Sequence, residues 1–461
     1  MTIDILEPNF CHVVDSILKP FQRFGVHLGL ERIQQLLVDL GNPHFSVPVI
    51  HVAGTNGKGS VCAYLSSVLT QAGYRVGRYT SPHLVDWTER ICLNEQPISF
   101  EHLQQLLLQV QDGVERASLR DPKELPTQFE VITAAAWLCF AQSRVDVAVV
   151  EVGLGGRLDA TNVCDHTLVS IITSISREHW QHLGPTLADI AREKAGILKS
   201  GCPAVVGPLP PDAAAVVRER IKLLGCPAVW PEPALEIRTA ESEFPVWLCL
   251  PENSRWAQRA QRGEQRWALY QGIEYPLPLC GAIQLTNSAL AIAALQILQQ
   301  LGWDISLDAI AIGMAKTRWS GRLEWTIWQN HQLLIDGAHN SAAATALRQY
   351  VDTLDDQSVT WVMGMLSTKA HADIFRALLR PDDRLCLVPV PDHSSADPSE
   401  LATLAHNICS RLDCQTYSDL FTALEAAVAY SGLIVLCGSL YLVGHFLRTA
   451  KTQRAQREEV P

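Results

Sequence analysis

A glycine-rich turn between an apolar run and a helical pattern is the feature that most constrains how this chain can fold. The run "VPVIHVAG" (47–54) predicts a strand, although Pro48 weakens the prediction near its start. It leads through "TNGKGS" into "SVCAYLSSVLTQAG" (60–73), where apolar residues recur at helical spacing until Gly73. The order of strand, glycine-rich loop and helix is typical of a βαβ unit.

The loop resembles a phosphate-binding loop in which one extra glycine, Gly59, separates Lys58 from Ser60. Gly54, Gly57 and Gly59 permit positive φ and allow backbone N–H groups to approach an anion. Lys58 supplies a full positive charge, and the Ser60 hydroxyl can ligate magnesium. The alternative interpretation is a strand-to-helix turn that binds nothing.

A second feature favours the nucleotide interpretation. The run "VDVAVVEVG" (145–153) is almost wholly apolar until Glu151, where an acid would face the phosphates and hold magnesium. A carboxylate at the end of a buried strand is costly unless it is paired or bound to a metal. The alternative is a strand end that faces solvent. The next turn, "GLGGRLDATN" (153–162), is either a plain loop or a ligand loop over the phosphates and the acceptor.

The remaining apolar runs predict two α/β domains. Runs such as "TLVSIITSI" (167–175) do not alternate in polarity, which is typical of parallel strands covered on both faces. We predict an N-terminal P-loop NTPase-type ATPase domain with a parallel sheet and a C-terminal Rossmann-like α/β domain. The predicted boundaries are 1–315 for the first, with the P-loop at 54–60 and a small antiparallel patch at about 230–280, then 316–450 for the second and 451–461 for a flexible tail.

Charge and cysteine usage exclude several classes of protein. The 461 residues carry 37 Lys and Arg against 48 Asp and Glu, a formal net charge of −11, which argues against a nucleic-acid partner. No apolar run reaches membrane-spanning length, and the N-terminus lacks a basic segment ahead of an apolar one. The thirteen cysteines form no CxxC pair and lie in apolar runs, as Cys139 does. These features predict a cytoplasmic protein with no membrane partner.

The loop "GTNGKGS" is the phosphate-loop form of the Mur-ligase superfamily. Within it, the chain closely resembles the folylpolyglutamate synthase / dihydrofolate synthase family, and the matching stretches follow the family's order over nearly the whole chain. They are "TSPHLVDWTERICLN" (80–94), "FEVITAAAW" (129–137), "EVGLGGRLDATN" (151–162), "EHWQHLG" (178–184), "IAREKAGILK" (190–199), "GRLEW" (321–325), "IDGAHN" (335–340) and "CGSLYLVG" (437–444).

The resemblance implies ATP-dependent formation of an amide bond. The γ-phosphate of ATP passes to a carboxylate, and the amine of L-glutamate then displaces phosphate from the acyl phosphate. Positive charge placed in advance by two Mg²⁺ ions and by lysines suits both steps. "GGRLDATN" resembles the bifunctional form, which acts on dihydropteroate and on reduced folates, whereas members that only extend folates tend to lack the Arg-Leu-Asp-Ala run. A monomer is expected.

The same resemblance implies a role for each site residue. ATP binding is implied for Gly54, Thr55, Asn56, Gly57, Lys58, Gly59, Ser60, Asn287, Arg322 and Asp336. Metal ligation is implied for Ser60, Glu151, His179 and Lys194, the last as a carbamate, and catalytic roles for Lys58, Lys194, His179 and His339. Folate and pterin contacts are implied for Ser81, Pro82, His83, Leu84, Phe129, Arg157, Asp159 and Ala160.

The chain departs from the family pattern at four places. Glu178 precedes His179 where the family has aspartate, and Ile283-Gln284 stands where His-Gln is common. Ser320 and Ser341 stand where proline is usual, which loosens two turns without removing a chemical group.

A monofunctional folylpolyglutamate synthase is one alternative, and two rival functions outside this family also remain open at this point. A ligase of peptidoglycan precursors needs a uridine-nucleotide-binding domain ahead of the P-loop, and only 53 residues precede Gly54. A non-catalytic nucleotide-binding module has no use for the full set of implied metal ligands. Glutamate-dependent release of ADP with dihydropteroate discriminates both rivals from the folate ligase.

Overall fold

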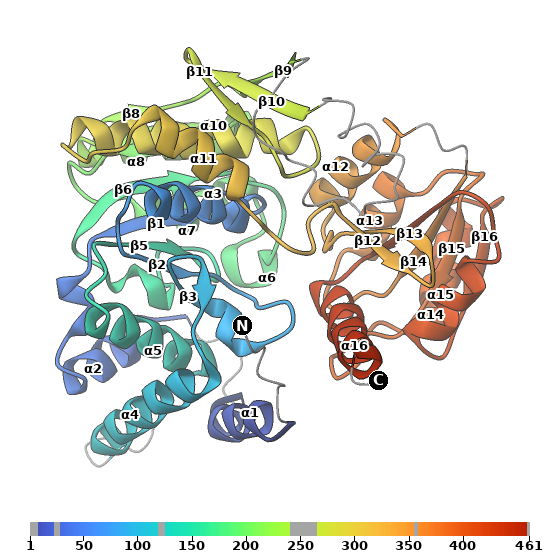
Figure 1. Ribbon diagram of the computed structural model, residues 1–461, viewed down its shortest axis with the longest axis horizontal. Helices are drawn as coiled ribbons and strands as arrows, with labels where there is room; N and C mark the ends of the chain where they lie inside the picture. Colours follow the sequence, from blue (N-terminus) through green and yellow to red (C-terminus); the bar gives the residue numbers. More distant parts are fainter. Residues whose placement is uncertain (1–7, 23–27, 119–124, 240–264, 355–357, 459–461) are drawn as a thin grey trace. The chain divides into compact units, whose positions relative to one another are not determined.

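The structure is a computed structural model that describes residues 8–22, 28–118, 125–239, 265–354 and 358–458. The chain divides into two compact units (Figure 1). Unit 1 comprises Met1–Leu235, Leu269–Tyr275 and Leu285–Thr317, and unit 2 comprises Glu236–Ala268, Pro276–Gln284 and Arg318–Pro461. The sequence prediction placed one linear boundary between residues 315 and 316.

Unit 1 is built on an eight-stranded sheet in the order β4-β3-β2-β5-β1-β6-β7-β8. The strand that leads into the glycine-rich loop, β1, lies in the middle and pairs in parallel with β5 and β6. Only β3 and β4, at one edge, run antiparallel to their neighbours. The strands are β1 (Val49–Ala53), β2 (Val76–Tyr79), β3 (Ile91–Leu93), β4 (Gln96–Pro97), β5 (Val147–Glu151), β6 (Thr167–Ile172), β7 (Ala204–Val206) and β8 (Ala228–Val229).

Helices cover both faces of this sheet. The glycine-rich loop ends in α3, which packs on β1, β2 and β5 and is itself covered by α11. On the opposite face α5 is nearest the sheet, and α1, α2 and α4 pack against it. The helices of this unit are α1 (Pro8–Gln22), α2 (Glu31–Asp39), α3 (Lys58–Gln71), α4 (Phe100–Ser118), α5 (Gln128–Gln142), α6 (Trp180–Leu183), α7 (Leu187–Lys194), α8 (Pro211–Leu224), α10 (Ile283–Gln300) and α11 (Leu307–Lys316).

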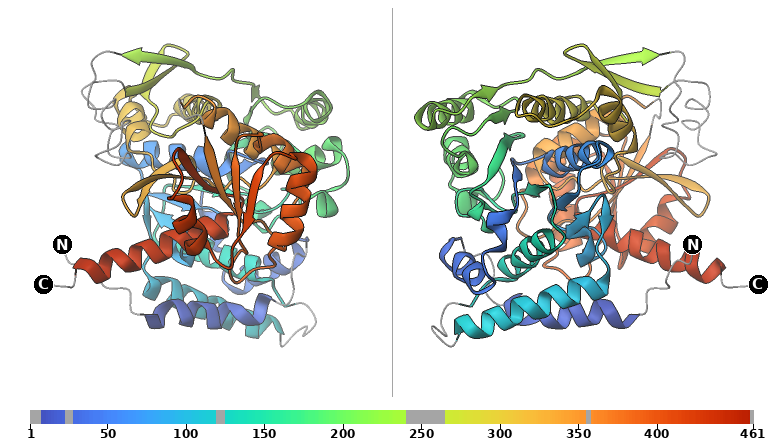
Figure 2. Two further views of the ribbon diagram at one scale, coloured as in Figure 1. Left: turned by 90° about the vertical axis from the view of Figure 1, so that its right-hand side faces the viewer. Right: turned by 60° about the vertical axis from the view of Figure 1, so that its left-hand side comes forward.

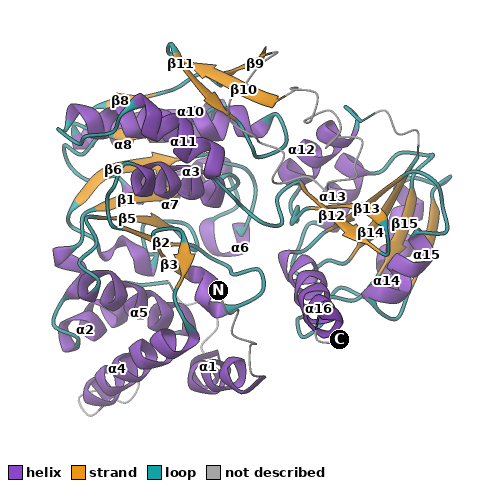
Figure 3. Cartoon of the chain, viewed as in Figure 1, coloured by secondary structure: helices purple, strands orange, loops and turns teal. Residues whose placement is uncertain are grey.

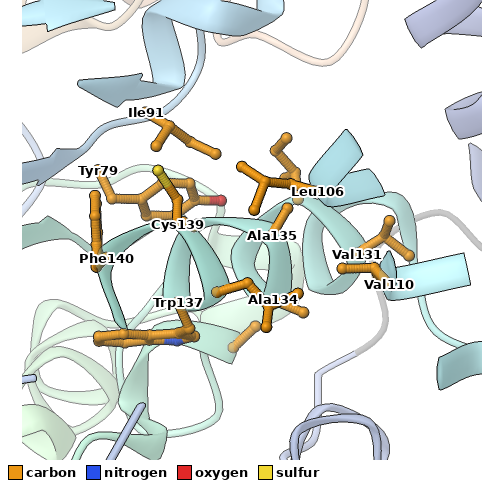
Figure 4. Packing of buried hydrophobic residues seen from close by; sticks show 14 of the residues in the cluster. Tyr79, Ile91, Leu106, Val110, Val131, Ala134, Ala135, Trp137, Cys139 and Phe140 are labelled. Carbon is orange, nitrogen blue, oxygen red and sulfur yellow. The ribbon is translucent and has the colours of Figure 1, made fainter. Parts of the chain in front are cut away.

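A large cluster of buried residues in the described part of the chain lies between the sheet and α5. Figure 4 shows Trp137 and Phe140 of α5 beside Tyr79 of β2, and all three are at most 1% exposed. Burial of aromatic and aliphatic side chains of this size stabilises each by roughly 1.5–3 kcal/mol relative to exposure. Both views of Figure 2 show α1 and α4 side by side beneath this cluster. The sheet edge that carries the glycine-rich loop therefore rests on a well-packed base.

A small three-stranded sheet of β9 (Leu235–Thr239), β10 (Gln265–Tyr270) and β11 (Ile273–Pro276) has the order β11-β10-β9. It falls within the segment of about 230–280 where the sequence predicts an antiparallel patch. Parts of its strands belong to each unit.

Unit 2 contains a six-stranded sheet in the order β12-β13-β17-β14-β15-β16, parallel except for β12. One core cluster joins it to α12, α13 and α14, whereas α15 packs on β14 and β15, and α16 packs on β17. Figure 3 shows this alternation of strands and helices. The elements are β12 (Glu324–Trp328), β13 (His331–Ile335), α12 (Ser341–Val351), β14 (Val359–Met363), α13 (His371–Leu378), β15 (Arg384–Leu387), α14 (Pro398–Ile408), β16 (Asp413–Thr416), α15 (Leu420–Ala427), β17 (Leu433–Cys437) and α16 (Leu440–Glu458).

The predicted fold class, two α/β domains with largely parallel sheets, is confirmed. The last helix extends to Glu458, into the segment 451–461 for which the sequence predicts a flexible tail. Among the described residues, every helix is too short or too polar to cross a membrane.

Candidate active site

The glycine-rich loop leaves no room for side chains at two of its glycines. Gly57 caps α3 with φ of +88°, and a Cβ there would lie 2.4 Å from Oδ1 of Asn287. A Cβ on Gly54 would lie 1.9 Å from Oγ1 of Thr173. Asn287 itself is buried in α10, so the structure brings this predicted nucleotide contact against the loop. A loop held this closely keeps its backbone N–H groups in fixed directions.

Polar residues that follow β6 hold the first half of the loop. The Thr55 N–H donates to the Ser174 carbonyl at 2.8 Å, and the Asn56 N–H donates to Oγ of Ser174 at 3.0 Å. Oγ1 of Thr173 donates to the Asn56 carbonyl at 2.7 Å. The sequence analysis missed these supporting residues. Their signal is "TSIS", a polar stretch directly after an apolar strand that pairs with the strand before the loop.

Lys58 and Glu151 meet at the start of α3. Nζ of Lys58 lies 3.8 Å from Oε1 of Glu151 and donates to the Thr55 carbonyl at 3.1 Å. Glu151, the last residue of β5, is 5% exposed and also accepts the Ser81 N–H at 3.3 Å. The lysine of the loop is therefore a cation that compensates this buried carboxylate.

Lys194, at the end of α7, is also directed at the loop. Its Nζ donates to the Gly54 carbonyl at 2.7 Å, and the residue is buried. Burial lowers the pKa of this amine to about 7, and the positive charge of Lys58 lowers it further, while Glu178 opposes the shift. A large share of the amine is therefore neutral at physiological pH, which is the form that reacts as a nucleophile.

The oxygen atoms beside the loop suit magnesium. Glu151 offers a buried carboxylate, and Ser60, which is 4% exposed, offers a hydroxyl in the first turn of α3. The described residues hold no group of three His, Cys, Asp or Glu side chains arranged as a complete metal site. Magnesium bound with nucleotides commonly takes one or two protein oxygens, with phosphates and water as its other ligands. The donor set beside the loop therefore fits the predicted ion.

His179 differs in its surroundings. It caps α6 with φ of +50°, its side chain is 45% exposed, and its Nε2 lies 3.8 Å from Oε1 of Glu178. Glu178 acts electrostatically on Lys194, so this pair lies in the electrostatic neighbourhood of the buried lysine. The role of His179 as a metal ligand remains a prediction.

The loop that follows Glu151 is held by Asp159. Oδ1 of Asp159 accepts the Thr161 N–H at 3.0 Å and the Thr161 hydroxyl at 2.6 Å, and Oδ2 accepts the Leu154 N–H at 2.8 Å. The residue is 3% exposed. Burial raises the pKa of this carboxyl, and the hydrogen bonds from Thr161 and Leu154 oppose that rise. Both oxygens are thus engaged by the loop itself.

Other predicted acceptor residues lie along the same loop. A Cβ on Gly153 would lie 2.4 Å from the Phe129 ring, so this ring packs directly on the loop. Arg157 donates to Oε1 of Glu193 at 2.9 Å, which fastens the loop to α7 next to Lys194. Ala160 is buried in a short 3-10 helix, Ala160–Val163.

The segment "SPHL" lies between β2 and β3. Its Ser81–Pro82 peptide bond is cis, and the Ser81 N–H contacts Glu151. Nδ1 of His83 accepts from Nε of Arg90 at 2.9 Å, and the Leu84 N–H donates to Glu89 at 2.8 Å. The segment therefore touches the predicted magnesium ligand directly at Ser81.

Three predicted residues form a separate cluster in unit 2. Asp336 is buried after β13 and accepts the Leu323 N–H at 2.9 Å and the Ala338 N–H at 2.8 Å. Burial raises the pKa of this carboxyl, against the nearby charges of Arg322 and His339. Nδ1 of His339 lies 2.7 Å from the Gly337 carbonyl, so Nδ1 carries a proton.

Comparison with known proteins places the chain in a family. Residues 322–449 match the family model described as "Dihydrofolate synthetase, C-terminal domain". The chain is 35% identical to the dihydrofolate synthetase of Saccharomyces cerevisiae, with 92% of this chain and 98% of that protein covered. It is 32% identical to the dihydrofolate synthase/folylpolyglutamate synthase of Bacillus subtilis, with coverage of 93% and 96%.

A solved structure agrees with these sequence relatives. The folylpolyglutamate synthase of Mycobacterium tuberculosis, complexed with ADP and AMPPCP, superposes with a TM-score of 0.82 at 30% identity, and covers 96% of this chain and 98% of that one. The two α/β units of this chain agree with this likeness. The chain belongs to the folylpolyglutamate synthase / dihydrofolate synthase family of ligases, within the Mur-ligase fold.

Proposed function

We propose that this chain is a bifunctional ligase that uses ATP to join L-glutamate to dihydropteroate and to folates that already carry glutamate. The observation that carries the proposal is the convergence of Lys58, Glu151 and Lys194 on one glycine-rich loop. The loop 153–162 begins two residues after Glu151 and holds three of the predicted acceptor residues, Arg157, Asp159 and Ala160. Chemistry on ATP and contact with the acceptor are therefore assigned to one continuous stretch of chain.

The reaction follows from two substitutions. A carboxylate oxygen of the acceptor attacks the γ-phosphorus of ATP, and the bond to ADP breaks. The amine of L-glutamate then attacks the carbonyl carbon of the acyl phosphate, loses a proton, and inorganic phosphate leaves. In the first step, negative charge builds on the oxygens of the transferred group. Lys58 and the N–H groups at the start of α3 are suited to stabilise that charge.

Ser60 and Glu151 are proposed to hold magnesium, which would neutralise phosphate charge during transfer. His179 and a carbamate on Lys194 are proposed to hold a second ion. The carbamate forms when the neutral amine adds to carbon dioxide and loses a proton, and the lowered pKa of about 7 favours that reaction. Arg322, Asp336 and His339 are proposed to act on the nucleotide, and Asn287 on its adenine side.

The acceptor is proposed to meet Ser81, His83, Phe129 and the loop that Asp159 holds. Eleven described cysteines are free thiols, which supports the proposal that the enzyme works in the cytoplasm. A monomer is proposed as the working form.

A second candidate function is the synthesis of dihydrofolate alone. The relative from Saccharomyces cerevisiae and the matching C-terminal family model both carry the name dihydrofolate synthetase, which favours this narrower activity. In that case the enzyme would accept dihydropteroate and would not extend a folate.

An acceptor panel tests both candidates. Glutamate-dependent release of ADP is measured with dihydropteroate, with a reduced folate monoglutamate and with a peptidoglycan precursor, and the product mass is checked for one added glutamate. The bifunctional proposal requires product from the first two acceptors, and product from dihydropteroate alone selects the narrower candidate. No glutamate-dependent ADP release with either folate acceptor would overturn the proposal. The Lys58→Ala variant controls for contaminating ATPases.

A further inference from the structure

A buried hydrogen-bonded chain links the central strand β1 to the loop after Glu151. His51, in the middle of β1, is 0% exposed, and its Nε2 lies 2.9 Å from Oγ1 of Thr161. Thr161 in turn lies 2.6 Å from Oδ1 of Asp159. On the other side of the imidazole, Nδ1 lies 3.8 Å from Sγ of Cys164. Neither the ATP chemistry nor the acceptor contacts proposed above use His51 or Thr161.

The chemistry of the groups fixes the direction of every proton in this chain. Asp159 accepts a backbone N–H group on each oxygen, which favours its carboxylate form, and the Thr161 hydroxyl donates to it. That hydroxyl has then given its one proton and must accept from Nε2 of His51. Nδ1 is left as an acceptor for the thiol of Cys164, whose pKa is raised by burial. His51 is therefore the neutral tautomer protonated on Nε2.

The hydrogen-bonded series from His51 through Thr161 ends at Asp159, and Asp159 shapes the acceptor loop. Through Leu154 and Thr161, Asp159 closes the turn that begins at Gly153. The same turn packs on Phe129 at Gly153 and on α7 at Gly156, whose Cβ would lie 2.9 Å from the Glu193 carbonyl. The contact of His51 with Thr161 holds the same turn at a third place, on β1. This strand enters the phosphate-binding loop three residues after His51, at Gly54.

We propose that His51 is a positioning residue, which sets the acceptor loop 153–159 relative to β1 through Thr161 and Asp159. The inference rests on the proposed function, because that function assigns the loop to the acceptor. Without the donor on Nε2, the Thr161 hydroxyl loses its orientation and the Asp159 carboxylate loses a short charge-assisted hydrogen bond. The loop then departs from the geometry in which the acceptor carboxylate meets the γ-phosphate.

Two matched pairs of variants test the proposal. Thr161→Val removes the hydroxyl at nearly constant shape, and Thr161→Ser keeps it. His51→Gln places an amide nitrogen where Nε2 stands, and His51→Asn places it where Nδ1 stands. We expect Thr161→Val and His51→Asn to raise KM for dihydropteroate on the order of 10-fold or more, because Thr161→Val removes the hydrogen bond to the Asp159 carboxylate and His51→Asn removes the donor that orients the Thr161 hydroxyl. Thr161→Ser and His51→Gln should retain most of the parent's value.

The KM for ATP separates positioning from a general defect. Because β1 leads directly into the phosphate-binding loop, a merely structural disturbance of β1 would raise KM for ATP as well. We expect KM for ATP to stay within about 2-fold of the parent in all four variants. Equal changes in both constants, or equal effects of the two members of each pair, would overturn the positioning role.

A measurement without turnover gives an independent answer. In protein labelled with ¹⁵N-histidine, the His51 ring should show the tautomer protonated on Nε2, assigned by its loss in His51→Gln. Amide exchange at Leu154 should accelerate in Thr161→Val and not in Thr161→Ser. An Nδ1-protonated ring, or unchanged exchange, would contradict the chain of donors. If the parent enzyme does not use dihydropteroate, both the proposed function and the role of His51 in placing the acceptor loop are wrong. If the parent is active but the two members of each variant pair behave alike, only the positioning role is wrong.

Discussion

A buried lysine beside a phosphate-binding loop has two chemical options, to act as a cation or to become a metal ligand. Lys194 is buried, donates to the Gly54 carbonyl, and has a pKa lowered to about 7 by burial and by Lys58. The second positive charge so close to Lys58 is unfavourable, and a carbamate would reverse its sign. The local electrostatics therefore favour modification over a permanent ammonium.

We expect Lys194→Ala and Lys194→Arg to be about equally impaired, by on the order of 100-fold or more in kcat, because neither side chain can form a carbamate. Added acetate should partly restore Lys194→Ala, since it can supply the missing carboxylate. Activity is measured as glutamate-dependent ADP release, and the mass of the parent enzyme is measured under carbon dioxide. High activity of Lys194→Arg, or an unmodified lysine in magnesium-bound active enzyme, would show that the residue acts as a plain cation.

Lys58 supplies a positive charge 3.8 Å from Glu151. We expect Lys58→Ala to lower ATP turnover by on the order of 10²–10³-fold, because a donor aimed at developing charge is lost. The fold should remain, which circular dichroism and a thermal melt can check. Lys222→Ala, at an exposed position of α8, is the matched control. Turnover at the parent rate with an unchanged KM for ATP would mean that the loop serves only as a turn.

Individual side chains of the site were predictable from the sequence to different degrees. Glu151 ends one apolar strand and Lys58 lies in the loop after its neighbour, and the carboxyl ends of neighbouring parallel strands meet at one edge, so their meeting was predictable. The role of Lys194 came only from family resemblance, because its approach to Gly54 spans 140 positions of sequence. Asp159 was predicted as a ligand contact, and the sequence could not show that backbone donors occupy its oxygens.

Buried strands were predictable from the sequence, whereas an exposed edge strand was not. The buried strands β1, β5 and β6 are mostly apolar, and the sequence analysis located them. The edge strand β16 reads "DCQT", has two polar exposed ends, and carries no apolar signal, so it was missed. An edge strand forms because its neighbour offers free N–H and carbonyl groups, which is a tertiary effect.

The junction between β1 and α3 allows a sharp test with two glycines. Gly57→Ala places a Cβ 2.4 Å from Oδ1 of Asn287 at φ of +88°, whereas Gly73→Ala, at the other end of α3, meets nothing within 4 Å at φ of +93°. Each substitution costs roughly 1–2 kcal/mol for the left-handed conformation. Only Gly57→Ala should also weaken ATP binding, because the loop must shift away from Asn287.

Binding of a fluorescent ATP analogue and thermal unfolding measure the two effects separately. The difference between the two alanine variants isolates the contact with Asn287, since their backbone strain is alike. Equal affinity for the analogue in Gly57→Ala and Gly73→Ala would show that the loop tolerates the displacement, and that close approach of Asn287 is not needed for the site.

The division of the molecule into units is not linear along the chain. Cys280 packs against the core of unit 2, and Arg266 pairs with Glu236 at 2.7 Å within the same unit. The segments 236–268 and 276–284 therefore belong with residues that follow them by dozens of positions. The pattern of apolar runs predicts one boundary near residue 316, because such a pattern does not show which distant segments pack together.

The stability of the whole chain should depend on pH through His51. Burial is the largest cause that lowers the pKa of this imidazole to about 3, and the charge of Lys199 adds to it. The unfolded chain has a histidine pKa near 6.5. Because the folded value is the lower one, the unfolded state binds the proton first, and stability is lost as pH falls from about 6.5 towards 3. Between pH 7.5 and pH 5 this group alone should remove about 2 kcal/mol of the free energy of unfolding.

The His51→Gln variant removes the titration and keeps a donor towards Thr161. Urea unfolding of parent and variant at both pH values should show that the parent loses about 2 kcal/mol more than the variant between pH 7.5 and pH 5. The other charged group on this chain, Asp159, is present in both proteins and cancels in the comparison, as Cys164 does. An equal loss in parent and His51→Gln would mean that His51 can be protonated in the folded state. The imidazole would then carry a proton on both ring nitrogens. The single direction of hydrogen-bond donation, from Cys164 through His51 and Thr161 to Asp159, would no longer hold.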